Sequence, residues 1–303
     1  MKQTQAEGRF STLISGYDFL EGPRWHDGRL WLSDFYKQQV IAVDMNGEIE
    51  TIAHVDQQPS GLGWLPDGRL LIVSMRDRKL LRREPDGSVA IHADLSGVAA
   101  GSLNDMVVDA EGRAYVGNFG FDLMGGAPLD KARLAMVTPD GQVSVAAEDL
   151  FFPNGSMITP DGRTLIVNET FGNRISCFDI QDGGLLGPRR DWAVFGPLPE
   201  GRDLNVLLPQ AKAAPDGGVL DADGAVWLAD AIGNRALRVE PGGRVLEEVS
   251  TGDQGVFACT LGGPERRTLF LCVAPDFFEH QRKGAGEAAI WAMPVAVPGA
   301  GRP

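Results

Sequence analysis

The chain has 303 residues, 43% of them hydrophobic and 23% charged, which is typical of a globular protein with a large core. Its net charge of −13 argues against a nucleic acid partner, because phosphates attract Lys and Arg clusters that this sequence lacks. The 39 glycines and 19 prolines are spread along the chain, which indicates many turns rather than disorder.

The N-terminal segment "MKQTQAEGRF" (1–10) is polar and lacks the apolar core of a signal peptide. No run of about 18 apolar residues follows it, so we expect no membrane span. The three cysteines, Cys177, Cys259 and Cys272, show no C-x-x-C spacing. We therefore expect reduced thiols and a cytoplasmic protein.

A short motif recurs in chain order, each time with an acidic turn followed by a strand-like apolar run. Turn residues such as Asp-Gly before β-branched and aromatic residues are typical of hairpins. The copies are "HDGRLWLSD" (26–34), "PDGRLLIVS" (66–74), "AEGRAYVGN" (110–118), "PDGRTLIVN" (160–168), "ADGAVWLAD" (222–230) and the degraded "PERRTLFLC" (264–272).

A second turn follows most copies, for example "DMNGEIE" (44–50) and "TPDGQVS" (138–144). Each unit therefore reads as four antiparallel strands in a repeat of about 40 residues, which is typical of a β-propeller blade. The six copies predict an all-β, six-bladed propeller that forms one domain over residues 1–303. The segment 11–16 is predicted to complete the last blade beside 288–295.

No convincing helix is predicted. Two longer insertions, roughly 119–133 and 182–214, are expected to be loops over one face. Such loops either shape a ligand site or decorate the fold passively, and the sequence favours neither.

The residue seven places before each turn acid, or six in the first copy, should begin the innermost strand of its blade. Because inner strands surround the central channel, these six residues should face one shared point. They are Glu21, Ser60, Asn104, Asn154, Asp216 and Ala258.

Four of the six carry carboxylate or amide oxygens: Glu21, Asn104, Asn154 and Asp216. Any one of them alone would be read as a turn or cap residue. Together, two carboxylates and two amides around one point predict a divalent cation with oxygen ligands. The smaller Ser60 and Ala258 would leave one side open to substrate and water, as in a catalytic metal site.

The strings "EGPRW", "ND" at 104–105, "PNG" at 153–155 and "PDG" at 215–217 resemble the SMP-30/gluconolactonase/LRE family, which includes regucalcin. The resemblance runs from Glu21 to the last strand. It implies a six-bladed propeller, one divalent cation in the channel and lactone hydrolysis. The metal ligands implied are Glu21, Asn154 and Asp216, with Asn104 nearby as a ligand or substrate contact. Ca²⁺ is the leading candidate, with Zn²⁺, Mn²⁺, Mg²⁺ or Fe²⁺ as alternatives.

The sequence departs from the sugar-lactone members of this family in two places. Ser102 stands where those members tend to carry an Arg, and "GNFGFD" (117–122) lacks the expected acid. Phenylalanines gather instead near the expected mouth, and we expect Phe119, Phe121 and Phe152 to contact the substrate. The other aromatic residues of this group are Phe35, Tyr36, Phe151 and Phe171. The substrate is predicted to be less polar than gluconolactone, although each phenylalanine could equally pack between blades.

The predicted reaction is metal-assisted opening of a small-molecule lactone, with Asp216 as first candidate for the general base and Asp105 as second. A phosphotriester or aryl ester hydrolase on the same site is an alternative. A non-catalytic propeller that uses its cation structurally and binds a protein partner is another, and an isomerase or lyase also stays open. No G-x-S-x-G, G-x-G-x-x-G or Walker pattern is present.

Overall fold

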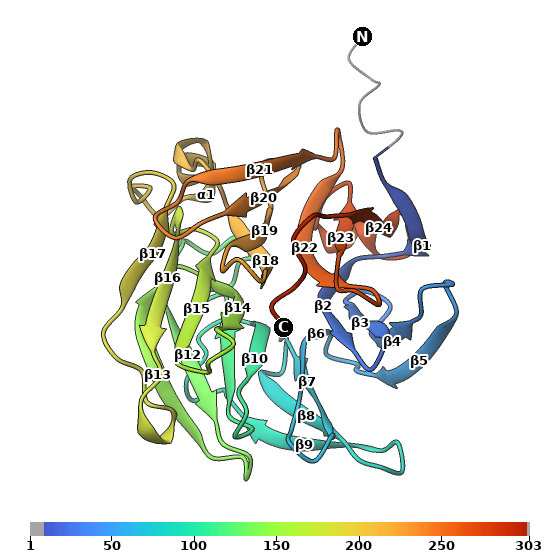
Figure 1. The fold of residues 1–303 in the computed structure, drawn as a ribbon. Helices are drawn as coiled ribbons and strands as arrows, with labels where there is room; N and C mark the ends of the chain where they lie inside the picture. Colours follow the sequence, from blue (N-terminus) through green and yellow to red (C-terminus); the bar gives the residue numbers. More distant parts are fainter. Residues whose placement is uncertain (1–8, 302–303) are drawn as a thin grey trace.

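The computed structural model describes residues 9–301 as six four-stranded antiparallel sheets around a central axis (Figure 1). This arrangement confirms the predicted six-bladed β-propeller. Residues 1–8, which make up most of the segment in which we expect no signal peptide, lie outside the described residues.

The first five blades follow one another along the chain, each running from its inner to its outer strand. Blade 1 contains β2 (Leu20–His26), β3 (Arg29–Asp34), β4 (Gln39–Val43) and β5 (Ile49–His54). Blade 2 contains β6 (Pro59–Trp64), β7 (Leu70–Ser74), β8 (Lys79–Arg83) and β9 (Val89–Asp94). Blade 3 contains β10 (Leu103–Val108), β11 (Ala114–Asn118), β12 (Ala132–Val137) and β13 (Val143–Leu150).

Blade 4 contains β14 (Pro153–Ile158), β15 (Thr164–Glu169), β16 (Arg174–Asp179) and β17 (Arg190–Val194). Blade 5 contains β18 (Pro215–Leu220), β19 (Val226–Asp230), β20 (Arg235–Val239) and β21 (Val245–Ser250). Blade 6 contains β22 (Gly255–Gly262), β23 (Thr268–Ala274) and β24 (Ala288–Pro294), and its outer strand is β1 (Ser11–Tyr17).

Blade 6 closes the ring, because β1 pairs antiparallel with β24 and places Ser11 opposite Ala292. In Figure 1 the blue β1 accordingly lies beside the red strands of the last blade. Past β24 the chain returns to the centre of the ring, where the backbone N–H of Ala300 donates to the carbonyl of Leu220.

The first hairpin explains why its motif is one residue shorter than the others. Asp27 and Gly28 both have positive φ, 48° and 75°, and form a two-residue turn between His26 and Arg29, which pair directly. Asp and Gly tolerate this conformation, which makes the pair suited to a tight hairpin. In blade 2 the pairing ends instead at Trp64 and Leu70, with a longer turn between them.

The insertions are more structured than predicted. The segment 182–214 holds the short 3₁₀ helices η1 (Asp182–Gly184) and η2 (Leu208–Gln210), the helix α1 (Leu204–Leu207) and the outer strand β17. A third insertion, between β23 and β24, carries the helix α2 (Glu279–Arg282) and was not predicted.

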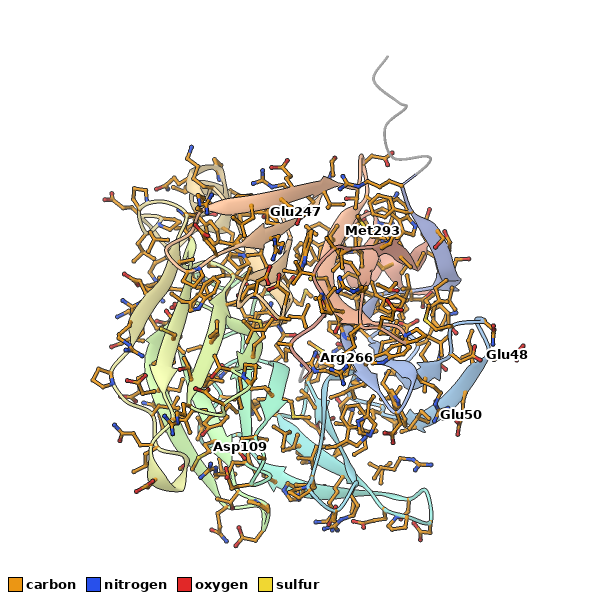
Figure 2. All side chains as sticks on the ribbon, in the orientation of Figure 1. Glu48, Glu50, Asp109, Glu247, Arg266 and Met293 are labelled. Atoms are coloured by element: carbon orange, nitrogen blue, oxygen red, sulfur yellow. The ribbon has the colours of Figure 1, made fainter. Side chains whose placement is uncertain are left out.

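Apolar clusters fill the spaces between sheets, while charged side chains such as Glu48 and Glu50 lie at the outside of the ring (Figure 2). Cys177, Cys259 and Cys272 are buried and form no disulfide. None of the helices in residues 9–301 has the length and apolar composition needed to cross a membrane.

Candidate active site

A cavity that is open to solvent lies where the inner strands begin, with a volume of about 710 Å³ when the solvent at its mouth is included. Its lining includes all four carboxylate and amide residues that the repeat alignment predicts to lie together: Glu21, Asn104, Asn154 and Asp216. They come from blades 1, 3, 4 and 5, and each is at least 93% buried. The fold thus brings residues that are up to 195 positions apart in the sequence to one place.

A β-bulge at the start of every inner strand directs these side chains. In blade 4, two residues separate Pro153 from Ser156, whereas one separates their partners Glu169 and Val167. The same one-residue excess occurs in the other five inner strands. A bulge turns side chains out of the regular alternation, and in every blade except the second, one residue in or beside the bulge lines the cavity.

Glycines allow the inner strands to approach one another at this level. A Cβ on Gly22 would lie 2.7 Å from the carbonyl oxygen of Ser60, and one on Gly155 would lie 2.6 Å from that of Asp216. Neither distance is possible for a real Cβ atom, so these two positions require glycine. The glycine that follows Glu21 and the one that follows Asn154 therefore set how closely their blades pack.

Two of the six aligned residues do not line the cavity. The Ser60 hydroxyl donates to Asn104 Oδ1 at 3.2 Å, and Ala258 is fully buried beside Gly217. Phe257, not Ala258, faces the cavity from blade 6. The expectation that Ala258 leaves an open side is therefore wrong. The bulge of blade 6 lies between Val256 and Ala258, and this position of the bulge displaces the cavity-facing residue by one.

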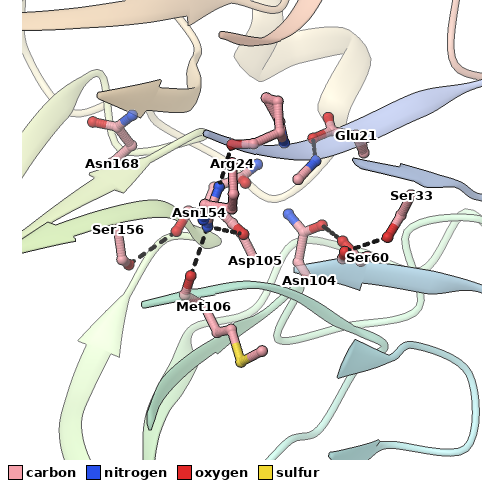
Figure 3. Close-up of polar contacts among 12 residues, drawn as sticks. Glu21, Arg24, Ser33, Ser60, Asn104, Asp105, Met106, Asn154, Ser156 and Asn168 are labelled. Atoms are coloured by element: carbon pink, nitrogen blue, oxygen red, sulfur yellow. Dashed lines mark hydrogen bonds and ion pairs between the residues drawn. The ribbon is translucent and has the colours of Figure 1, made fainter. Parts of the chain in front are cut away.

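The two asparagines present opposite ends of their amides to the cavity, and Figure 3 shows the bond between Asn104 and Ser60. Asn154 Nδ2 donates to Thr170 Oγ1 at 3.1 Å and to Asp216 Oδ1, which leaves its Oδ1 as a free acceptor. The Thr170 hydroxyl donates to the Pro215 carbonyl at 2.9 Å and so must accept from Asn154. In Asn104, by contrast, Oδ1 accepts from Ser60, which leaves Nδ2 as a donor.

Burial raises the pKa of both carboxyl groups in the cavity. Loss of water raises the pKa of Glu21 to about 8, with a further contribution from the negative charge of Asp105. Burial, followed by the charge of Glu21, also raises the pKa of Asp216 well above its usual range. No Lys or Arg in residues 9–301 forms a salt bridge with either group. The carboxylates lack a counter-charge where they face each other.

Asp105 lies behind this surface and does not line the cavity. Its Oδ1 is 2.6 Å from Nη2 of Arg24, which also donates to the Met106 carbonyl at 2.7 Å (Figure 3). Both side chains of the pair are at least 94% buried. The structure therefore gives Asp105 a fixed cationic partner of its own.

The donor set fits a divalent cation. When ionised, Glu21, Asp105, Asp216 and Arg24 carry a formal charge of −2 together, which one such ion would balance. Carboxylate and amide oxygens are the ligands that hard cations prefer. No cluster of three or more His, Cys, Asp or Glu side chains suited to a metal occurs in residues 9–301, so an ion here would need the amide oxygen of Asn154 as well.

Aromatic side chains form most of the remaining inner wall. Phe119 and Phe152 line the cavity and meet edge to face with centroids 4.5 Å apart. Phe121 does not line it and packs behind Phe171, with centroids 6.1 Å apart. The other aromatic residues of the wall are Phe19, Phe35, Tyr36, Phe171, Phe257 and Phe277.

Sequence reasoning missed several of these residues. Thr170 and Phe257 lie just outside the compared positions, and Phe277 belongs to the unpredicted insertion. Arg24 could have been recognised from the sequence, because a cationic side chain in the apolar inner strand "LEGPRWH" requires a buried anionic partner.

The fold and this constellation define a six-bladed propeller with a polar centre at the start of its inner strands. Residues 19–275 match the model of the SMP-30/Gluconolactonase/LRE-like region. The chain therefore belongs to the SMP-30/gluconolactonase/LRE-like family.

Two relatives have names that state an activity. Pentonolactonase XacC of Haloferax volcanii is 25% identical over 84% of this chain and 81% of its own length. The 6-deoxy-6-sulfogluconolactonase of Pseudomonas putida is 26% identical over 69% of this chain and 67% of its own length. Among solved structures, the calcium-binding protein regucalcin from Agrobacterium tumefaciens superimposes with a TM-score of 0.77 at 20% identity. That match covers 98% of this chain and 96% of the other, and it supports the fold.

Proposed function

We propose that this protein is a metal-dependent hydrolase that opens a lactone less polar than gluconolactone. The observation that carries the proposal is the convergence of Glu21, Asn104, Asn154 and Asp216 on one apolar cavity. The pentonolactonase and sulfogluconolactonase activities named for two relatives support the reaction class.

Glu21, Asp216 and Oδ1 of Asn154 would hold the cation, because these three groups present unsatisfied oxygens to the same cavity. Ca²⁺ is the first candidate, and Zn²⁺, Mn²⁺, Mg²⁺ and Fe²⁺ are alternatives. The chemistry that such an ion supplies is polarisation of the ester carbonyl and a lower pKa of nearby water.

The side chains of this protein supply the remaining steps. Asn104 donates through Nδ2 to the lactone carbonyl, because its oxygen is already occupied by Ser60. Asp216 Oδ2, which lies opposite the oxygen bonded by Asn154, accepts a proton from the attacking water. The water oxygen bonds to the carbonyl carbon, the bond from this carbon to the ring oxygen breaks, and the departing alkoxide takes up the proton that Asp216 accepted, which gives the hydroxy acid.

Asp105 serves this reaction as a buried counter-charge rather than as the base. Its carboxylate is bonded to Arg24 and does not reach the cavity lining. A general base has to lie within hydrogen-bond reach of the proton that it accepts. We therefore assign the base to Asp216 of the two candidates.

An aryl ester or phosphotriester hydrolase is the second candidate, favoured by the eight aromatic side chains around the cavity. The test is a panel of lactones, aryl esters and phosphotriesters, assayed with added cations and with chelator. We expect lactone turnover that chelator abolishes and that returns with a divalent cation. Turnover of aryl esters or phosphotriesters alone would select the second candidate.

Matched variants locate the activity. Glu21→Gln and Asp216→Asn are expected to lose bound metal and lactone turnover together, and Asn104→Ala to lower kcat by about 10²–10³-fold. Asp67→Asn, in the exposed turn of blade 2, is the control. Full turnover in both Glu21→Gln and Asp216→Asn would refute the site.

A further inference from the structure

The cavity is polar only at its floor. The polar side chains in its lining are Glu21, Asn104, Asn154, Thr170 and Asp216, together with the hydroxyl of Tyr36. The Tyr36 hydroxyl already donates to the Phe277 carbonyl, and the Thr170 hydroxyl donates to that of Pro215. Above the floor, the described residues therefore offer a substrate hydrocarbon surface and no free side-chain donor.

The lower part of this hydrocarbon wall is aromatic and fixed in place. Phe152 has a φ of 55°, a left-handed conformation that is unusual for a bulky side chain. Its carbonyl accepts from the backbone N–H of Thr170, and its ring packs against Phe119 and Phe171, with centroids 4.5 and 5.4 Å away. The strained backbone places the Phe152 ring in the cavity two residues before Asn154.

The outer part is aliphatic and reaches solvent. Met124 and Ile232 line the cavity, yet are 50% and 42% exposed, so they mark its mouth. Leu123, Leu204 and Leu208 also line the cavity and are half-buried, as are the aromatic Phe171 and Phe277. The apolar lining is thus continuous from the polar floor to the surface.

Except for Ile232, which lies in the turn between β19 and β20, this outer wall comes from two insertions that are bonded to each other. The backbone N–H of Leu129 donates to the Arg202 carbonyl at 2.8 Å, and Arg202 Nε donates to the Leu129 carbonyl at 2.7 Å. Arg202 also pairs with Asp130 at 3.3 Å. Below these bonds, Leu129 and Leu207 pack with Phe121 in a small buried cluster. Phe121 thereby supports the wall from behind.

We propose that the substrate is a lactone that carries an unbranched alkyl chain, an inference that rests on the proposed lactone hydrolysis. The ring lies at the floor, and the chain passes Phe152 and leaves between Met124 and Ile232. A polyhydroxy lactone would lose water from hydroxyl groups that find no partner on this wall. A fused aromatic lactone would use the aromatic rings and leave the aliphatic mouth unfilled.

The first test is a series of γ- and δ-lactones with alkyl chains of increasing length, compared with gluconolactone. Each buried methylene is expected to raise kcat/KM about three- to fourfold until the chain reaches the mouth, where the gain ends. A rate that is independent of chain length, or highest for gluconolactone, would overturn the inference. A fused aromatic lactone that exceeds every alkyl lactone would overturn it as well.

Variants at the mouth test the path of the chain. Met124→Ser and Ile232→Ser should lower the ratio of long-chain to short-chain kcat/KM by about three- to tenfold each. Ile91→Ser is the matched control, because Ile91 is 61% exposed on β9 and lies outside the cavity lining. An equal effect of Ile91→Ser and Ile232→Ser on this ratio would contradict the assignment.

A binding measurement separates this inference from the proposed reaction. Alkyl lactams of the same chain lengths, in which an amide replaces the ester, are titrated into the protein by calorimetry. Affinity that rises with chain length and falls in Ile232→Ser supports the chain path even if no lactone is hydrolysed, in which case only the reaction fails. Lactone turnover without any dependence of lactam affinity on chain length overturns the chain path and leaves the reaction standing.

Discussion

Arg24 of blade 1 and Asp105 of blade 3 form an ion pair that crosses the inner strand of the blade between them. Their Nη2 and Oδ1 atoms are 2.6 Å apart. The crossing is possible because blade 2 has Gly61 at this point, where a Cβ would lie 2.8 Å from Asp105 Oδ1. Blade 2 thus has no side chain at this point, and the charged side chains come from blades 1 and 3.

Removal of one partner of this pair should be costly. Arg24→Met leaves the Asp105 carboxylate buried without its cation, so we expect the free energy of unfolding to fall by about 3–5 kcal/mol. The double variant Arg24→Met/Asp105→Asn should recover part of that loss, because the uncompensated charge is gone. Chemical denaturation of chelator-treated protein measures both values.

Arg29→Met is the control for this prediction. Arg29 and Glu50 also form a close pair, but both side chains are at least one-third exposed, and such a pair contributes about 0–1 kcal/mol. Equal losses in Arg24→Met and Arg29→Met would show that the Arg24–Asp105 pair does not hold the centre.

Asp216→Asn should weaken metal binding without lowering the stability of the metal-free protein. In metal-free protein the variant removes a buried carboxyl group that repels Glu21, so its melting temperature should equal or exceed that of the parent chain. Calorimetric titration should show at least about tenfold weaker binding of divalent cations, because one anionic ligand is missing. A metal-free variant that melts well below the parent would mean that Asp216 serves the fold rather than an ion.

Thr170 should position Asn154. Without its hydroxyl, Asn154 Nδ2 loses an acceptor and the amide is free to turn its oxygen away from the cavity. Thr170→Val, which keeps the shape of the side chain, is therefore expected to weaken cation affinity about 10–100-fold. Thr170→Ser keeps the hydroxyl and should restore most of that affinity. Equal affinities in the Val and Ser variants would show that the hydrogen bond has no such role.

The contact between blades 4 and 5 should be sensitive to one methyl group. Gly155→Ala would place a Cβ 2.6 Å from the Asp216 carbonyl oxygen and 2.8 Å from the Gly217 Cα. Since backbone atoms cannot move aside locally, we expect a loss of roughly 1–3 kcal/mol and weaker cation binding. Gly97→Ala is the control, because no atom lies within 4 Å of the added Cβ. A stable Gly155→Ala with normal cation affinity would contradict this account of the packing.

The fold was predictable because each blade repeats its own turn chemistry, and a repeat fixes both strand number and relative position. The same symmetry predicts from the sequence alone that Glu21, Asn104, Asn154 and Asp216 lie together. It failed at Phe257, because the bulge of blade 6 lies between Val256 and Ala258 and the cavity-facing residue is displaced by one.

Features that do not repeat were not predictable. The Arg24–Asp105 pair depends on the missing side chain of Gly61 in blade 2. The orientation of the Asn104 and Asn154 amides depends on the hydroxyl groups of Ser60 and Thr170. The insertion that carries Phe277 has no counterpart in the other blades. Phe121 and Phe152 looked alike in sequence, but only the left-handed backbone of Phe152 brings its ring into the cavity.

The pairing of β1 with β24 links assembly of the centre to the order of synthesis. Ser11 and Ala292 are 281 positions apart, so the sheet that they share forms only after β24 has emerged from the ribosome. Glu21 follows β1 after a short link, and its strand packs against β22 of the same last blade. A nascent chain with five finished blades would still lack the packing of β22 against the strand that carries Glu21. A cation that binds the complete ring would therefore favour its sealing at the final stage of folding.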